Sequence, residues 1–238
     1  MTDRTFDNQT LLRQLILLDG IPRRVIALTG VASAGTLLGA LLLGFPLWAV
    51  VLATLLPWVP PFAVDMALIS RHYGWLALFY ALVVTQIGHF LEHVVQMGQI
   101  HIQDRPLPQA RGVFGALDIE WVHFAWNTWV LVAVLLLLRP FARNPWLRLT
   151  ALFAAWHELE HAYIIWTFLE TGRAGGPGLL ADGGRLGGGL PLSRPDLHFL
   201  YNVVETVPLL IAFVHAVRRF CDVCLARARA HAPVGGSR

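Results

Sequence analysis

Long apolar runs, each interrupted by only a few polar positions, divide this chain into six segments. A helix needs about 18 or more mainly apolar residues to cross a bilayer. The pattern therefore predicts an all-α, polytopic membrane protein with about six transmembrane helices. We expect them at Arg24–Gly44, Leu47–Ile69, Trp75–Ile100, Val113–Leu138, Pro145–Leu169 and Leu197–Val217.

The second segment contains the string PWVPP. Proline has no amide N–H, and its ring collides with the carbonyl group four residues earlier, so proline inside a helix produces a kink. We therefore expect the second transmembrane helix to be kinked at Pro60 and Pro61.

Composition and charge agree with a membrane protein. Charged residues make up 14% of the 238 residues, compared with about 25% in soluble domains. Every cation is arginine, which, with abundant Leu, Ala and Gly, is typical of a GC-rich bacterial genome. If the N-terminus is inside, thirteen arginines lie in inner segments and five in outer ones. This predicts a bacterial plasma-membrane protein with both termini cytoplasmic, and the net charge of +3 does not point to nucleic acid.

Two pairs of polar strings recur in the last four segments. QIGHFLEHVVQ and AAWHELEHAYI share H-x-x-E-H, and EWVHFAWNTW and DLHFLYNVVE share H-F-x-x-N. The repeated order predicts an internal duplication, with the last four helices forming a duplicated four-helix bundle whose halves are parallel repeats. We assign residues 71–140 to the first helix pair and residues 141–220 to the second, which includes a glycine-rich outer loop.

Three further regions flank this bundle. Residues 24–70 would form two accessory transmembrane helices. Residues 1–23 would be a cytoplasmic leader, in which LLRQLILL is either a short interfacial helix or a poorly ordered segment. Residues 221–238 would be a cytoplasmic tail containing CDVC, with Cys221 and Cys224 either binding metal or remaining reduced thiols.

The recurring polar residues predict a metal site. Residues three or four apart share a helix face, and residue counts place these residues in one layer in the outer half of the bilayer. A charged group near mid-bilayer costs about 2.5–3.5 kcal/mol on insertion scales, whereas imidazole and carboxylate suit transition metals. The candidate ligands are His89, Glu92, His93, His123, His157, Glu160, His161 and His198. The candidate supporting residues or extra ligands are Gln96, Glu120, Asn127, Asn202 and Glu205.

The number of histidines favours two metal ions, Fe, Zn or Cu, because a tetrahedral zinc takes only four ligands. The alternative is one ion with supporting histidines. Two E-x-x-H pairs, Glu120–His123 and Glu158–His161, resemble those of di-iron carboxylate bundles. The two H-x-x-x-H boxes resemble those of histidine-rich membrane hydroxylases and desaturases, whose H-x-x-H-H box is missing here. These resemblances imply oxygen-linked redox chemistry.

Three functions are compatible with this site. The first is a membrane oxidoreductase that acts on a lipophilic substrate. The second is an intramembrane zinc hydrolase, in which HELEH binds zinc and Glu158 acts as the base. The third is a metal transporter, sensor or assembly factor, because transporters place their sites at repeat interfaces. Heme binding is disfavoured by the close H-x-x-x-H pairs.

Overall fold

A computed structural model describes residues 21–230, which form helices joined by loops, with no strand in this range. The helices are α2 (Arg23–Leu42), α3 (Leu47–Leu55), α4 (Val59–Tyr73), α5 (Trp75–His101), α6 (Ile119–Leu137), α7 (Pro145–Thr171) and α8 (Arg194–Ala230). Short 3-10 turns lie at Leu56–Trp58, Leu107–Gln109 and Phe114–Ala116. The predicted all-α class is confirmed.

Five segments of the described chain are long and apolar enough to cross a membrane. They are Arg23–Leu42, Leu47–Arg71, Trp75–His101, Ile119–Leu137 and Arg194–Phe220. Helix α7 is as long as α5, at 27 residues, but its central His-Glu-Leu-Glu-His string makes it more polar. A multi-pass membrane protein is thus supported, and a sixth span stays a prediction.

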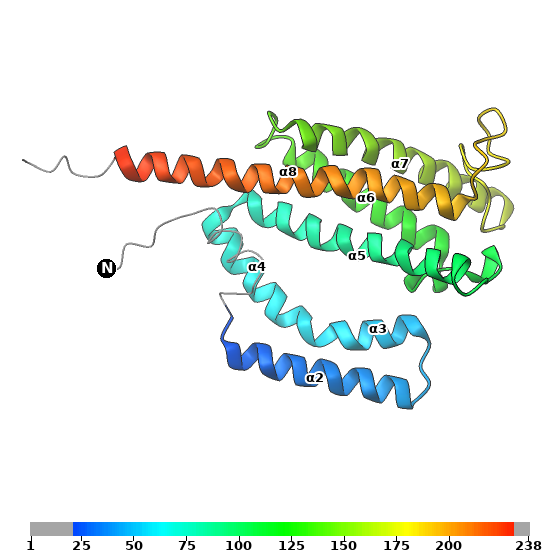
Figure 1. Cartoon of the computed structure of the whole chain (residues 1–238), viewed down its shortest axis with the longest axis horizontal. Coiled ribbons are helices and arrows are strands. Elements are labelled where there is room, and N and C mark those ends of the chain that lie inside the picture. The colour runs from blue at the N-terminus through cyan, green and yellow to red at the C-terminus, as the bar shows by residue number, and fades with distance from the viewer. Residues whose placement is uncertain (1–20, 231–238) are drawn as a thin grey trace, which may run out of the picture.

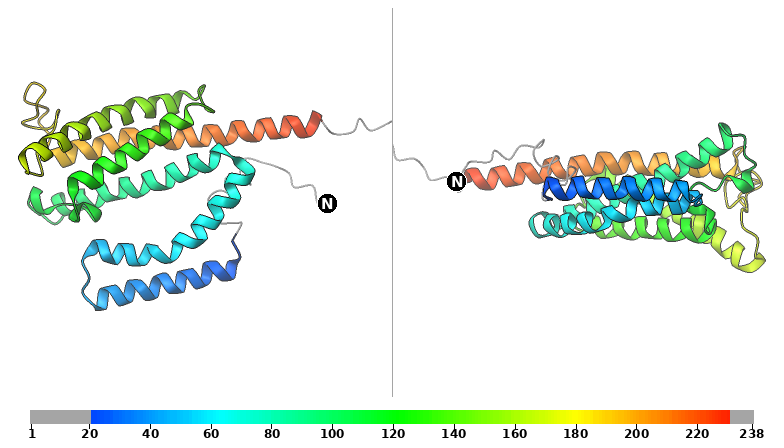
Figure 2. Two further views of the ribbon diagram at one scale, coloured as in Figure 1. Left: turned by 180° about the vertical axis from the view of Figure 1, so that it is seen from behind. Right: turned by 90° about the horizontal axis from the view of Figure 1, so that it is seen from below.

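Helices α5, α6, α7 and α8 pack as a four-helix bundle (Figure 1). Each helix contacts the next, and α8 closes the ring by packing on α5. Helices α2 and α3 form a hairpin that stands apart from this bundle, and α4 links the hairpin to it through α5 (Figure 2). The loops from α5 to α6 and from α7 to α8 lie at the same end of the bundle (Figure 1).

The break in the second apolar segment differs from the predicted kink. Pro60 and Pro61 lie in the first turn of α4, and the irregular turn is one turn earlier, at Leu56–Trp58. A proline ring excludes the carbonyl oxygen four residues before it. These two prolines therefore disturb positions 56 and 57, while they themselves fit the first turn of a new helix.

Helix α6 begins later than predicted. The apolar run starts at Val113, but the helix starts at Ile119, after Asp118 accepts hydrogen bonds from the backbone N–H groups of Glu120 and Trp121. Such a side-chain cap marks a helix start because it satisfies otherwise unpaired N–H groups. The shorter helix places His123 four residues after the first residue of α6, Ile119.

The apolar core fills the end of the bundle that lies away from the α5–α6 and α7–α8 loops. Large, fully buried side chains there include Phe79, Leu76, Leu82, Leu137, Leu147 and Leu209. Most buried polar side chains of the bundle instead lie toward the loop-bearing end, with the histidines. Burying apolar area favours folding by about 25 cal/mol per Å², so this core fixes the helices that present the polar layer.

Two predicted regions at the chain ends are only partly covered. The leader at residues 1–23 lies almost wholly outside the described residues, so the LLRQLILL helix falls outside them too. Helix α8 continues beyond Val217 to Ala230, through part of the predicted tail. The side chains of Cys221 and Cys224 lie outside the described part of the structure.

Candidate metal centre

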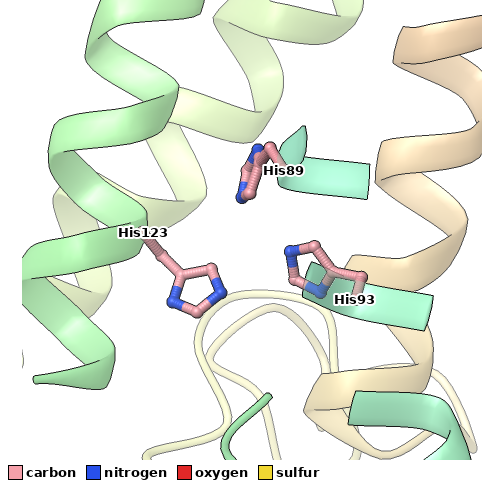
Figure 3. Close-up of side chains that lie close together, drawn as sticks. All are labelled: His89, His93 and His123. Carbon is pink, nitrogen blue, oxygen red and sulfur yellow. The ribbon is translucent and has the colours of Figure 1, made fainter. Parts of the chain in front are cut away.

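Six histidines form two buried triads. His89 and His93 from α5 meet His123 from α6, and in Figure 3 these three rings point toward a common space. The second triad comes from α7 and α8, and its members are His157, His161 and His198. In each triad one ligand atom per residue lies within 4.8 Å of the other two. The predicted imidazoles are therefore together in two groups that could each hold a metal ion.

Local helix geometry explains how each triad forms. Residues i and i+4 share one helix face, so each H-x-x-x-H box directs two rings the same way. The third ring is set by its own helix. Nδ1 of His123 donates to the carbonyl oxygen of Ile119 at 2.7 Å, and Nδ1 of His198 donates to that of Arg194 at 2.9 Å. Both rings therefore keep Nε2 free to bind a metal.

The two triads face each other across the bundle. The rings of His123 and His161 are nearly parallel, 8° apart with centroids separated by 5.9 Å. The rings of His89 and His157 are 10° apart at 6.5 Å. This face-to-face arrangement makes one six-histidine cluster, rather than two sites at separate places.

Several histidine nitrogens are buried without a partner. Neither ring nitrogen of His89 or His93 has a hydrogen-bond partner among the described residues, and neither does Nε2 of His198. Leaving a buried polar atom unpaired costs about 1–3 kcal/mol, and such atoms are rare in native proteins. A bound cation would satisfy these lone pairs, so the donor set fits a metal.

Glu92 and Glu160 lie outside the triads and hold the α5–α6 and α7–α8 loops. Glu92 Oε1 accepts hydrogen bonds from three backbone N–H groups, of Val113, Phe114 and Gly115. Glu160 Oε1 accepts one from Leu179 at 2.7 Å. These contacts support a loop-holding role, and direct metal ligation by these two glutamates stays a prediction.

Two glycines allow these loops to approach so closely. Gly112 and Gly178 have φ values of +70° and +75°, a region that side chains disfavour. A Cβ atom at Gly112 would meet Glu92 Oε1, and one at Gly178 would meet Glu160 Oε1. Glycine is therefore required at both positions for backbone conformation and for space.

Replacing Gly178 with alanine is expected to release the α7–α8 loop from Glu160. The positive φ alone costs about 1–2 kcal/mol, and the Cβ atom also displaces the carboxylate. Limited proteolysis should then cut residues 172–193 faster than in the parent protein. Gly187→Ala is the matched control, because Gly187 has φ +63° but an open surrounding. Equal acceleration in both variants would contradict a role for the Glu160 contact.

A buried ion pair joins α6 to α8. Arg194 donates through Nη1 to Glu120 Oε1 at 2.8 Å and through Nη2 to Oε2. The same Oε1 accepts from the backbone N–H of Gly175 at 2.7 Å, and Arg194 Nη1 also reaches the Gly176 carbonyl at 3.1 Å. Glu120 is thus held by an arginine and a loop, and not by the histidines.

The remaining predicted supporting residues are also engaged. The side-chain amide of Asn127 donates to the carbonyl of His123, and that of Asn202 to the carbonyl of His198, at 2.9 and 3.0 Å. The Gln96 amide donates to the Ala110 carbonyl at 2.8 Å. Glu205 differs, because its Oε2 atom lies 2.9 Å from Nδ1 of His157 in the buried interior. Glu205 therefore bonds a triad ring directly.

A cavity of about 460 Å³ lies beside the triads, under the α5–α6 and α7–α8 loops. His93, His123, His161 and His198 all line it, so both triads open onto the same space. Its apolar lining includes Leu107, Pro108, Ile119, Ala174, Pro177 and Pro195. Arg111, Asp182 and Arg194 line its loop side. A small molecule in this cavity would contact both triads at once.

Glu158 does not line this cavity. Its Oε1 atom accepts a hydrogen bond of 2.7 Å from the Thr128 hydroxyl on α6. A base that activates a metal-bound water must lie within hydrogen-bond reach of that water. The observed contact directs Glu158 toward α6, which does not favour the hydrolase interpretation of HELEH.

The sequence reasoning missed Arg194 and the two loop glycines. In the sequence, Arg194 is one of the five arginines assigned to outer segments and has no other distinguishing feature. Because a buried carboxylate needs a partner, the presence of Glu120 in an apolar helix could have prompted a search for one. Gly112 and Gly178 carry no comparable signal, because Gly178 is one of many glycines in its loop and nothing in the sequence around Gly112 marks a contact with Glu92.

Comparison with known proteins finds no family model, no curated protein and no solved structure that matches this chain.

Proposed function

We propose that this chain is an integral membrane metalloprotein that binds two transition-metal ions, one in each histidine triad. The observation that carries this proposal is the pair of buried, facing triads whose ring nitrogens lack partners. Imidazole donors suit Zn, Cu and Fe, whereas Mg, Ca and Mn prefer oxygen ligands. Three protein ligands per ion leave a coordination position for a further ligand.

We propose oxidoreductase chemistry at this centre, with a lipophilic small molecule as substrate. A pair of redox-active ions, when bound, would supply two one-electron changes. The chain's own residues would bind the substrate and exclude water. Glu92 and Glu160 hold the loops over the cavity and limit water, and the apolar lining accommodates an apolar body. The apolar core beneath the histidines favours an enzyme over a transporter, because an ion path would need polar groups through it.

We further propose that the bundle arose by duplication. The two halves repeat the same contacts, which supports this. In each half the histidine near the start of the second helix bonds the carbonyl four residues before it. The asparagine four residues later bonds that histidine's own carbonyl. The glutamate of each H-x-x-E-H box bonds the following outer loop.

The proposed topology has six spans, with both termini on the cytoplasmic side of a bacterial plasma membrane. The positive-inside distribution of arginine supports it. Helix α7 would be the sixth span, because α6 and α8 flank it in the bundle and its polar residues His157, Glu160 and His161 are buried there. The metal centre would then lie in the outer half of the bilayer.

Oxygen uptake by protein in lipid nanodiscs tests the proposed chemistry. With copper or iron bound and a lipophilic hydroquinone present, we expect uptake in which two hydroquinones and one O₂ give two quinones and two waters. His123→Ala and His198→Ala should each abolish it, whereas Glu158→Gln should not. Ester or peptide hydrolysis that needs zinc and is lost in Glu158→Gln would contradict the proposal and favour the hydrolase.

A further inference from the structure

The two halves of the bundle differ beside the second triad. Glu205 lies seven residues after His198, and the residue seven after the equivalent His123 is Val130. Glu205 is fully buried, with its Oε2 atom 2.9 Å from Nδ1 of His157. Val130 is equally buried but offers no hydrogen-bonding atom to His89, the counterpart of His157. One half therefore has a buried carboxylate where the other has a methyl-bearing side chain.

This difference changes how firmly each triad is oriented. In the second triad two rings are held through Nδ1, His157 by Glu205 and His198 by the Arg194 carbonyl. In the first triad only His123 is held in this way. Both nitrogens of His89 and of His93 lack partners among the described residues. The second triad thus loses less freedom when a metal binds, and Nε2 of His157 already lies 3.2 Å from Nε2 of His161.

The negative charge of Glu205 also favours metal binding at the second triad. A carboxylate that accepts the second N–H of a ligating histidine makes the ring a stronger donor, and removing such a partner typically lowers metal affinity about 10–100-fold. The negative charge also attracts a cation, and this attraction is weakly screened in a buried site. The first triad has no carboxylate at the matching position.

We propose that the two triads are unequal metal sites and that Glu205 makes the second triad the tighter one, which fills first. This inference rests on the proposed dinuclear centre. Glu205 acts as a positioning residue through His157. With limited metal, the protein would hold a single ion at His157, His161 and His198, and the first triad would be the site that loses its ion more readily.

Zinc titration of the metal-free protein in detergent, in competition with a chromophoric chelator, tests this inequality. The parent protein should bind two equivalents in two steps that differ about 10–100-fold in affinity. His123→Ala should lose the weaker step and keep the tighter one. His198→Ala should do the reverse. Neither variant alters Glu205, so this comparison identifies which triad fills first.

Variants of Glu205 test its role. Glu205→Val copies the first half and should weaken the tighter step about 10–100-fold, so that the two steps merge. Glu205→Gln keeps a hydrogen-bond acceptor without the charge and should give an intermediate loss. Thr206→Val is the matched control, because Thr206 is the adjacent buried residue and bonds Gln86, not a triad ring. It should leave both steps unchanged.

The outcomes separate this inference from the proposal on which it rests. No zinc binding by the parent protein would refute the dinuclear centre itself. Two equivalents bound with equal affinity would leave that centre intact and overturn the inequality. The inequality would also be overturned if the tighter step disappeared in His123→Ala. If the tighter binding step survived both Glu205 substitutions, the role proposed for Glu205 would be refuted.

Discussion

Replacing His93 and His161 together with alanine is expected to remove both metal ions from the purified protein. Each substitution takes one nitrogen ligand from one triad. Structural zinc sites with four ligands bind with about 10–16 kcal/mol, so one ligand contributes about 3 kcal/mol, or more than a hundredfold in affinity. Elemental analysis after dialysis against a chelator measures this loss.

His101→Ala is the control for this double variant. His101 is an exposed histidine at the end of α5 and bonds Asp196, outside both triads. We expect it to keep the full metal content of the parent protein. If the double variant retained as much metal as His101→Ala, the triads would not be the metal sites. Circular dichroism on each variant verifies that the helices are intact.

Replacing Arg194 with alanine is expected to lower the free energy of unfolding by about 3–5 kcal/mol. Its partner Glu120 has a side chain only 1% exposed, and the arginine side chain is 12% exposed. Removing one member of a buried pair leaves the other charge without compensation, and the cost of that is about 3–5 kcal/mol. Unfolding in mixed detergent micelles, followed by tryptophan fluorescence, provides the measurement.

The contact between His101 and Asp196, at the same end of the bundle, supplies the comparison. His101 and Asp196 have side chains that are 57% and 29% exposed, and exposed pairs contribute less than about 1 kcal/mol. His101→Ala should therefore change stability little. The double variant Glu120→Gln with Arg194→Gln should recover part of the loss, because no buried charge then stays unpaired. Equal effects of Arg194→Ala and His101→Ala would contradict the buried-pair account.

Hydropathy alone predicted most helix positions. Helices α5 and α7 begin at the predicted residues and end within two residues of the predicted ends. Two of the differences from the predicted helices have local causes. The break before α4 follows from the reach of a proline ring, and the late start of α6 follows from the cap at Asp118. Neither cause changes average hydropathy.

The part of the candidate site that depends on helical periodicity, the six histidines, was predictable from the sequence. The spacing within H-x-x-x-H fixes two rings on one face, and both triads contain the expected histidines. The contacts of Glu92 and Glu160 were not predictable, because their partners are backbone N–H groups of loops. The position of such a loop depends on the whole bundle and on glycines at positive φ, such as Gly112 and Gly178.

X-ray absorption spectroscopy on the purified wild-type protein, combined with elemental analysis, tests the dinuclear histidine centre most directly. We predict two metal ions per chain, each surrounded by imidazole nitrogens at about 2.0–2.1 Å if the metal is zinc. Metal-free protein would contradict the proposal. So would sulfur ligands at about 2.3 Å, which would instead assign the metal to Cys221 and Cys224.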